Sequence, residues 1–417
     1  MSDKFINMRT VTNNPFTPGA DTVPLIWAGR TEQITDWESI VRPRRNAGLP
    51  ERGRTILGDA GLGKSSLVRR ISKMAESRGD WVTPQIRIPS GADSMKAVAT
   101  AVLSLADRAG LPSSRERRIK DILDRVRTVS AQGMSLSWDR SVGPEPYTAL
   151  TDLLVEVGQA AVKNDCVVVI HIDEVQNITN DSERSQLLIS LGDAISYEMP
   201  VQAPGNVAFT RVLPLAVYLT GLPDFADMAG ARKGATFARR FATTVLEPIG
   251  QDDLIMALRP FVTQGWEVAD DRGGTTRIHM TADAADMIVD LCCGEPFLFQ
   301  LAGERAWYAG TEDVITTDDV REGWINVRGE AVAHVERILE RLPDRERQFI
   351  EAMAALPPQD RTLNTIAGSM GLSCGSQAGP TAQRLDTVRG IIDRGRPYTF
   401  RHRAIEAYLT SSWPQIQ

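Results

Sequence analysis

The sequence predicts an α/β protein with a parallel sheet at its centre, a helical segment after it and a small domain at the C-terminal end. Between residues 24 and 248, apolar strand-like runs alternate with segments of helical periodicity, which is the pattern of parallel α/β sheets. A glycine-rich turn joins the first of these strands to a helix, and two acidic residues close the most hydrophobic strand. Strand-like runs end near residue 250, and only helical patterns follow up to about residue 330.

Length and composition place the chain among globular proteins. Its 417 residues suggest two or three domains at about 150 residues each. The hydrophobic share of 42% and the charged share of 24% are close to the average of folded proteins. No run approaches the about 18 apolar residues of a membrane helix, and the first residues, MSDKFINMRTVTNNPF, lack the apolar core of a secretory signal. We therefore expect a cytoplasmic protein that does not associate with membranes.

The cysteine and histidine residues and the net charge argue against several kinds of site. The four cysteines and four histidines show no metal-ligand spacing, so we expect neither a disulfide framework nor a zinc site. A net charge of −6 offers no overall attraction for nucleic acid. Lysine is scarce, with only seven in the chain, and one of them, Lys64, falls inside the glycine-rich turn.

The clearest strand covers residues 166–172, which are apolar apart from His171 and mostly β-branched, as in a strand covered on both faces. Shorter or weaker strands are predicted at 55–57, 81–88, 213–220 and 243–246. Helical periodicity is found around 67–74, 95–105 and 187–195. Residues 1–23 are polar and turn-rich and indicate an arm or linker. Residues 110–145 indicate an insertion, with a charged helix at 113–129 and an extra strand at 134–138.

The strongest motif runs from Gly58 to Ser65 and fits G-x-x-x-x-G-K-[ST] between a strand and an amphipathic helix. Glycines let successive backbone N–H groups face an anion, and the helix N-terminus adds its positive dipole end. Lys64 is then expected to reach the β- and γ-phosphates, and the Ser65 hydroxyl to bind Mg²⁺. A turn with an incidental lysine is the alternative. The residues predicted to contact the nucleotide here are Gly58, Asp59, Ala60, Gly61, Leu62, Gly63, Lys64, Ser65 and Ser66.

Asp173 and Glu174 follow the most hydrophobic strand and support the same interpretation. A carboxylate at this place can hold Mg²⁺ through water, and its neighbour can polarise an attacking water molecule. We assign the first role to Asp173 and the second to Glu174. The alternative is that both acids only cap the next helix.

These motifs, in this order, resemble AAA+/STAND-type P-loop ATPases, and most of all their origin-recognition and initiator branch, over residues 15–410. The resemblance implies a P-loop parallel-sheet core at 24–248, a helical lid subdomain at 249–334 and a winged helix-turn-helix at 335–417. It also implies ATP and Mg²⁺ as ligands. Gly29 and Arg30, in the segment Gly-Arg-Thr-Glu, resemble a box that lies against adenine in that group, and Asp-Glu-Val-Gln at 173–176 resembles a variant of its Walker B motif.

The resemblance implies two further roles. Thr220, at the end of the next strand, stands where a sensor residue orients the hydrolytic water, although it is as readily a strand cap. Arg239 and Arg240 precede the fifth strand, where related proteins carry an arginine that reaches the nucleotide of a neighbouring subunit. We prefer Arg240; an arginine-rich surface is the alternative. The lid segment Gly-Glu-Pro at 294–296 resembles the GxP element of STAND proteins, and no sensor arginine is found there.

The C-terminal segment has helical patterns at 344–356, 362–370 and 381–392, followed by a strand at 398–401. Three helices followed by a hairpin with a basic tip resemble a winged helix. Residues 361–417 carry seven arginines against three acids, which suits contact with DNA phosphates. The residues predicted to contact double-stranded DNA are Gln383, Arg384, Thr387, Arg389, Arg394 and Arg396.

Two functions follow from these observations. The first is an ATP-binding and ATP-hydrolysing protein whose nucleotide state controls self-assembly or DNA engagement through the winged helix. The second is a STAND-like signalling or defence switch, in which the winged helix is an internal lever or binds a partner and DNA is not bound. In either case hydrolysis can be slow or depend on a homo-oligomer that forms on ATP binding. A metabolic kinase is disfavoured because no substrate motif accompanies the phosphate site.

Overall fold

The computed structural model describes residues 8–19, 22–113, 146–203, 207–230, 239–269 and 274–416. Most of the predicted insertion at 110–145, with both of its expected elements, lies outside this part. The chain divides into two compact units. The sheet unit contains Thr31–Leu57 and Val68–Val245, and the helical unit contains Met1–Arg30, Gly58–Leu67 and Leu246–Gln417.

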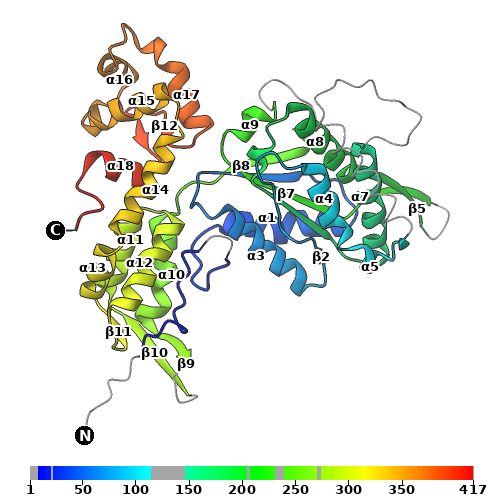
Figure 1. The fold of residues 1–417 in the computed structure, drawn as a ribbon, viewed down its shortest axis with the longest axis horizontal. Helices are drawn as coiled ribbons and strands as arrows, with labels where there is room; N and C mark the ends of the chain where they lie inside the picture. Colours follow the sequence, from blue (N-terminus) through cyan, green and yellow to red (C-terminus); the bar gives the residue numbers. More distant parts are fainter. Residues whose placement is uncertain are drawn as a thin grey trace. The chain divides into compact units, whose positions relative to one another are not determined.

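A parallel sheet forms the centre of the sheet unit, in agreement with the predicted fold class (Figure 1). The strand order is β2-β4-β7-β1-β8, and β3 also pairs with β4. All of the ladders in this sheet are parallel. The strands are β1 (Gly53–Leu57), β2 (Trp81–Val82), β3 (Ile86–Arg87), β4 (Val168–Asp173), β7 (Leu215–Gly221) and β8 (Phe241–Val245). Strands β4 and β7 are buried over their whole length, which explains why their sequences are continuous apolar runs.

Helices cover this sheet, and their apolar faces complete its core. The longest are α7, at 18 residues, and α8, at 15 residues. Asn180 caps the start of α8, where its side chain accepts hydrogen bonds from two backbone N–H groups. The helices are α1 (Thr31–Asp36), α2 (Arg42–Asn46), α4 (Ser94–Leu103), α5 (Ala106–Ala109), α7 (Pro146–Lys163), α8 (Asp181–Ile195) and α9 (Phe225–Met228), and α3 (Lys64–Ser77) belongs to this unit from Val68 onward.

A separate antiparallel hairpin follows α8, and the sequence did not predict it. It consists of β5 (Glu198–Ala203) and β6 (Val207–Val212), which pair along their whole length. Figure 1 shows it extending away from the central sheet. The hairpin ends just before β7, so it does not interrupt the parallel ladder.

The helical unit also contains a small three-stranded sheet. Its first helices are α10 (Gln251–Thr263), α11 (Ala282–Cys292), α12 (Pro296–Ala309), α13 (Thr317–Ile325) and α14 (Arg328–Glu340). The strands are β9 (Trp266–Ala269), β10 (Thr275–Met280) and β11 (Val314–Ile315), in the order β11-β10-β9. The prediction that only helices occupy 250–330 was therefore wrong. Ile278 and Met280 alternate with more exposed neighbours along β10, and the sequence Asp-Asp-Arg-Gly-Gly at 270–274 is a hairpin signal.

Residues 8–19, which we expected to form part of an arm or linker, are packed into the helical unit. The Phe16 ring is buried and stacks on Phe261, with ring centroids 5.6 Å apart. The buried Arg9 guanidinium forms an ion pair with Asp319 at 3.3 Å. One aromatic ring and one cation thus fix a polar segment that has no periodicity of its own.

The C-terminal module, residues 335–416, has three helices, a two-stranded hairpin and a last helix. These elements are α15 (Asp344–Ala354), α16 (Leu363–Ser369), α17 (Gly379–Thr387), β12 (Ile392–Asp393), β13 (Thr399–Phe400) and α18 (Arg403–Thr410). This is the predicted order, although α17 ends five residues before the predicted boundary at 392. The module's own core includes Phe349, Leu385 and Ile405.

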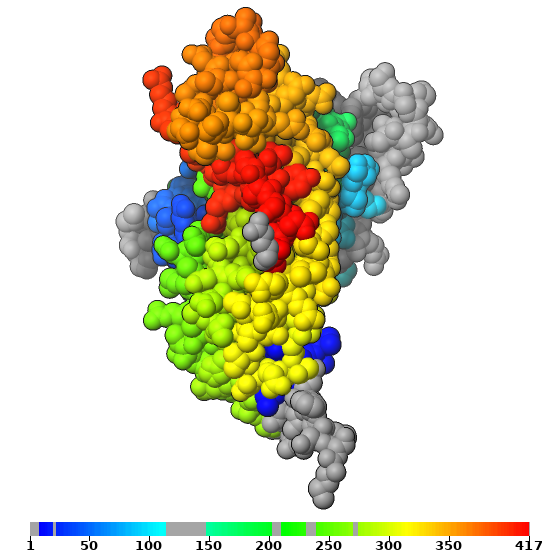
Figure 2. Space-filling view, turned by 90° about the vertical axis from the view of Figure 1, so that its left-hand side faces the viewer, coloured from blue at the N-terminus to red at the C-terminus, as the bar shows by residue number. Residues whose placement is uncertain are grey.

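The last residues of the chain attach the module to helices α11 and α13. The Trp413 indole N–H donates to the Leu291 carbonyl at 3.0 Å, and the Trp324 indole N–H donates to the Pro414 carbonyl at 2.9 Å. Figure 2 shows this red segment lying against the yellow helices of the same unit. None of the helices in the described residues is long and apolar enough to cross a membrane.

Candidate nucleotide-binding site

The glycine-rich motif forms a tight loop between β1 and α3. Gly61 and Gly63 have φ values of 90° and 80°, in the left-handed region that favours glycine. The Lys64 ammonium group donates to the carbonyl oxygens of Gly58 and Asp59, at 2.8 and 2.9 Å. The loop therefore curls around its own lysine and leads into a helix N-terminus, which is the geometry expected of a phosphate site.

Arg30 links this loop to the segment that follows β8. Its guanidinium donates to the Leu62 carbonyl at 3.0 Å and to the Glu247 carbonyl at 2.8 Å. Burial lowers the pKa of Arg30 to about 10, against the opposing effect of nearby carboxylates, so the side chain stays charged at neutral pH. Gly29 precedes it with φ 62°, and a Cβ atom there would lie 3.0 Å from the Asp253 carboxylate. The pair predicted to lie against adenine thus includes an arginine that holds the phosphate loop itself.

Side chains from α14 and from the C-terminal module lie against the loop. His402 Nε2 is 3.9 Å from Asp59 Oδ2, and both residues are buried. Burial raises the pKa of the Asp59 carboxyl, although His402 and Lys64 oppose this shift. His334 lies so close to Gly61 that a Cβ atom on that glycine would be 2.4 Å from its Cε1. The loop is therefore in contact with residues far from it in the sequence.

Glu295 joins the two histidines. It is fully buried at the start of α12, and His334 Nε2 lies 3.3 Å from one of its oxygens. His402 Nδ1 lies 3.1 Å from the other oxygen, without the alignment of a hydrogen bond. Burial alone would raise the pKa of Glu295, but His402, His334 and Arg30 outweigh it and hold the pKa below its ordinary value. We call Asp59, Glu295, His334 and His402 the His–Glu cluster.

The sequence did not predict this cluster as part of the site. Only Asp59 was assigned there, from its place in the motif. His334 and His402 make up half of the four histidines in the chain, but they lie on α14 and just before α18, with no local pattern around them. The only signal was the Gly-Glu-Pro segment, which places a carboxylate next to a proline at a helix start.

Asp173 ends β4 with both carboxylate oxygens engaged, and the residue is only 1% exposed. Gln85 Nε2 donates to Oδ2 at 2.9 Å, and the Glu174 backbone N–H donates to Oδ1 at 2.9 Å. The Thr220 hydroxyl also donates to Oδ1. Carboxylate oxygens fixed in this way suit Mg²⁺, which binds one or two carboxylates and keeps several waters. In the described residues no group of three or more His, Cys, Asp or Glu side chains gathers as a metal site.

Glu174 has the left-handed backbone angle φ 59°, which is uncommon for a residue other than glycine and is typical of functional sites. The Gln176 amide donates to the Glu174 carboxylate, and the Gln176 side-chain oxygen accepts from the Leu222 N–H at 3.0 Å. Gln176 therefore orients the proposed base by bridging it to the end of β7. This gives a physical reason for glutamine at the fourth position of the Asp-Glu-Val-Gln segment.

The three residues with further predicted roles, Thr220, Arg239 and Arg240, differ in burial and in their contacts. Thr220 is completely buried, and its hydroxyl is also 2.9 Å from His171 Nε2. Arg240 forms an ion pair with Asp193 at the end of α8. Arg239 beside it is exposed. Arg232 and Lys233 fall in the segment 231–238, which lies outside the described residues, and the choice of arginine finger stays a prediction.

The basic residues of the C-terminal module are mostly paired inside the molecule. Arg389 is only 7% exposed and lies beyond the end of α17, so the prediction that it is an exposed helix residue facing DNA was wrong. Its Nε lies 2.7 Å from Glu346, and Arg384 Nε lies 2.8 Å from the same carboxylate. Arg394 pairs with Asp386 at 2.9 Å. Glu346 lies on α15, outside the segment in which the arginines were counted, so the local excess of positive charge is smaller than that count suggests.

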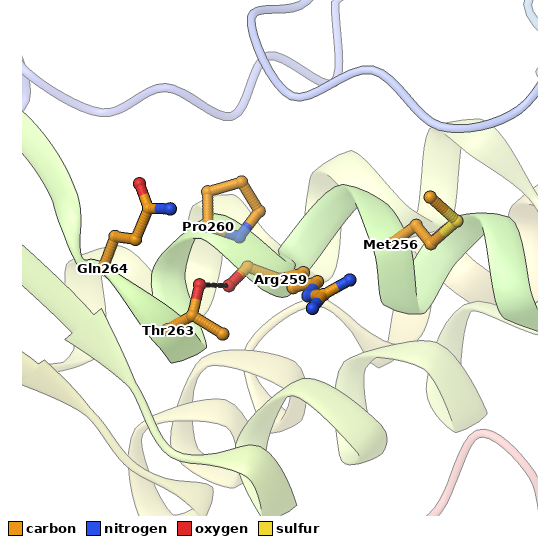
Figure 3. Close-up of a pocket in the computed structure, with 5 residues that line it drawn as sticks. All are labelled: Met256, Arg259, Pro260, Thr263 and Gln264. Atoms are coloured by element: carbon orange, nitrogen blue, oxygen red, sulfur yellow. Dashed lines mark hydrogen bonds between the residues drawn. The ribbon is translucent and has the colours of Figure 1, made fainter.

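Four of the candidates for DNA contact are exposed on the surface: Gln383, Thr387, Arg394 and Arg396. A separate hollow of about 320 Å³ lies along α10 and is lined by Met256, Arg259, Pro260, Thr263 and Gln264 (Figure 3). The Thr263 hydroxyl donates to the Arg259 carbonyl there at 2.9 Å. None of these residues belongs to the predicted nucleotide site, and we assign the hollow no role.

Comparison with known proteins gives a result for structures only. No family model matches the sequence, and no curated protein matches it. Among solved structures, the Aeropyrum pernix ORC2 protein in its ADPNP-ADP complexes matches with a TM-score of 0.53 and 15% identity, over 94% of this chain and 95% of that one. The chain has the fold of an AAA+ P-loop ATPase of the origin-recognition type.

Two other solved structures are similar at lower scores. The Walker-type ATPase of Pyrococcus abyssi matches this chain with a TM-score of 0.47 and 15% identity, over 91% of this chain and 97% of that one. A point mutant of RuvB from Thermotoga maritima matches with a TM-score of 0.41 and 14% identity, over 93% of this chain and 97% of that one.

Proposed function

We propose that this protein binds ATP with Mg²⁺ and hydrolyses it. The observation that carries the proposal is the loop Gly58–Ser65, curled around Lys64 at the start of a helix in a fold of the AAA+ type. Asp173 and Glu174 support it from the end of β4, where one carboxylate is fixed by donors and the other is oriented by Gln176. Mg²⁺ would neutralise charge on the phosphates.

Each residue of the proposed site has its own role. Lys64 and the loop N–H groups would bind the β- and γ-phosphates, and Ser65 and Asp173 would hold the metal. Glu174 accepts a hydrogen bond from the attacking water and orients it. Thr220 fixes Asp173. An arginine supplied by a second copy of the chain, from the pair at 239–240, would stabilise charge on the transferred phosphoryl group and make hydrolysis depend on assembly.

The test is nucleotide binding and hydrolysis by three forms of the full chain. Wild type should bind a fluorescent ATP analogue and release phosphate from ATP. Lys64→Ala should lose binding, whereas Glu174→Gln should bind ATP and leave it unhydrolysed. Parental hydrolysis by Glu174→Gln would contradict the role of this residue, and unchanged binding by Lys64→Ala would contradict the site.

We further propose that the nucleotide state of the loop is passed to the C-terminal module through the His–Glu cluster. Asp59 and Gly61 belong to the loop, Glu295 and His334 to the lid helices, and His402 to the module. Phosphates bound at the loop would add negative charge beside Asp59. This charge would change the electrostatic interactions within the buried His–Glu cluster. The module then acts as an internal lever. The paired arginines favour this function, because carboxylates of the same chain hold three of them: Arg384, Arg389 and Arg394.

DNA engagement is the second candidate, and exposed Arg396 in the β12–β13 turn is the observation that favours it. Binding of labelled duplex DNA at several salt concentrations tests it, with and without ATP. Arg396→Glu should weaken binding and reduce the salt dependence. Arg345→Glu, at an exposed arginine on α15, is the matched control. Absence of duplex binding in all nucleotide states would leave the lever function alone.

A further inference from the structure

Three side chains form a hydrogen-bonded row at the buried ends of β4 and β7. His171 Nε2 lies 2.9 Å from Thr220 Oγ1, and the Thr220 hydroxyl donates to Asp173 Oδ1. His171 and Asp173 are two positions apart on β4, so they share one face of the strand. All three are among the most buried polar residues of the sheet unit. The proposed function used Asp173 and Thr220 but gave His171 no role.

The number of available hydrogens determines which atom donates in each of these two hydrogen bonds. A hydroxyl has one hydrogen, and an ionised carboxylate can only accept. Since Thr220 donates its hydrogen to Asp173, its oxygen must accept from His171, and the Nε2 atom of His171 must carry a proton. Without that donor, the Thr220 hydroxyl could turn and give its hydrogen to another acceptor, and Asp173 would lose a partner on Oδ1.

We propose that His171 is a positioning residue of the magnesium site, which orients the Asp173 carboxylate through the Thr220 hydroxyl. The inference rests on the proposed function, because it assigns Asp173 to Mg²⁺. It differs from a packing role, since a buried ring that only fills space needs no proton at a particular nitrogen. Gln85 and the Glu174 N–H hold Asp173 from other directions, so the loss of His171 should misplace the carboxylate without unfolding the strand.

The experiment compares nucleotide affinity with and without metal. The dissociation constant of a fluorescent ATP analogue is measured in excess Mg²⁺ and in EDTA for wild type, His171→Leu and His171→Gln. Leucine has a similar volume and no donor, whereas glutamine can place an N–H near the position of Nε2. We expect Mg²⁺ to strengthen binding to wild type, and His171→Leu to lose roughly fivefold to tenfold of that gain, the size expected for one hydrogen bond. Affinity in EDTA should not change, and His171→Gln should recover most of the gain.

A second variant guards against misfolding of the first. Thr220→Val keeps the shape of Thr220 and removes its hydroxyl, so it should lose the same part of the Mg²⁺ gain. The double variant His171→Leu/Thr220→Val should lose no more than either single one, because both act through the same hydrogen bond.

Three results would overturn the proposal. One is a normal Mg²⁺ gain in His171→Leu, and another is an equal loss of affinity in EDTA and in Mg²⁺, which would show only structural support. The third is additive losses in the double variant. If wild type itself binds no nucleotide in either buffer, the proposed function fails and this inference fails with it, whereas the first three results leave nucleotide binding intact.

Discussion

His402 Nε2 lies 3.9 Å from Asp59 Oδ2, so a residue of the C-terminal module reaches the phosphate loop inside a single compact unit. The same imidazole lies 3.1 Å from Glu295, the N-cap residue of α12. The loop, the start of α12 and the module therefore share one buried group of ionisable side chains. Any change of charge at the loop is expected to be felt first at these residues, because electrostatic interactions are strong where water is excluded.

Glu295→Gln should destabilise the protein at neutral pH by about 3 kcal/mol, because it removes a buried carboxylate that faces the Arg30 cation. The pKa of Glu295 is held below its ordinary value, so its contribution is present above that value and is lost as the pH falls through the folded pKa. Chemical denaturation at pH 7 and at an acid pH below the folded pKa of Glu295 should show a large difference from wild type only at pH 7. The exposed Glu322→Gln on α13 is the control. An equal loss at both pH values would mean that the carboxylate charge is not what stabilises the cluster.

His402→Ala should uncouple the C-terminal module from the loop. In wild type, adding a nucleotide should change the rate of amide hydrogen exchange in β12, β13 and α18. In His402→Ala this change should be largely lost while nucleotide affinity stays within about threefold, a shift of less than about 1 kcal/mol. His279→Ala on β10, outside the cluster, is the matched control. A wild-type response in His402→Ala would show that nucleotide binding affects the module by another route, and no response in wild type would show that it does not affect the module.

Gln176→Met should lower the rate of ATP hydrolysis with little effect on nucleotide affinity. The Gln176 amide holds the Glu174 carboxylate, and loss of this contact leaves the proposed base free to turn away from the water. Misplacement by about 1 Å costs up to about a hundredfold, so we expect kcat to fall between roughly tenfold and a hundredfold at constant KM. Gln186→Met on α8 serves as the control. A fall in affinity of the same size would point to a collapsed site instead.

Glu346→Gln should destabilise the C-terminal module, because it leaves Arg389 buried without this carboxylate. The expected loss is about 3 kcal/mol in the free energy of unfolding. Glu351→Gln on the same helix removes an exposed ion pair with Arg347 and should have little effect. Similar stability of the two variants would contradict the assignment of Glu346 as the partner that keeps these arginines inside the molecule.

Local patterns in the sequence predicted the parallel sheet and the phosphate loop, because both depend on short segments. The apolar run before Asp173 and the glycines around Lys64 each specify their own structure. The His–Glu cluster could not be found in this way. His334 and His402 become neighbours of Glu295 only through tertiary packing, and nothing near either histidine in the sequence indicates a partner.

The basic C-terminal segment was also misjudged, because the partner of two of its arginines lies far away in the sequence. Counting charges between residues 361 and 417 treated Arg384 and Arg389 as surface groups. Their partner, Glu346, precedes that segment and meets them only because α15 packs on α17. The small sheet of β9, β10 and β11 was missed for a different reason, since its strands are short and partly exposed and their alternation is weak.

Residue 61 lies at a position where the phosphate-loop pattern accepts any amino acid, yet this chain leaves it no such freedom. Its φ of 90° suits only glycine, and the His334 ring occupies the space of a side chain. Gly61 and His334 should therefore vary together among relatives of this protein, with a smaller residue at 334 wherever 61 is larger. Such paired variation would distinguish, by amino-acid sequence alone, the relatives whose α14 packs directly on the loop from those in which the loop is open to solvent.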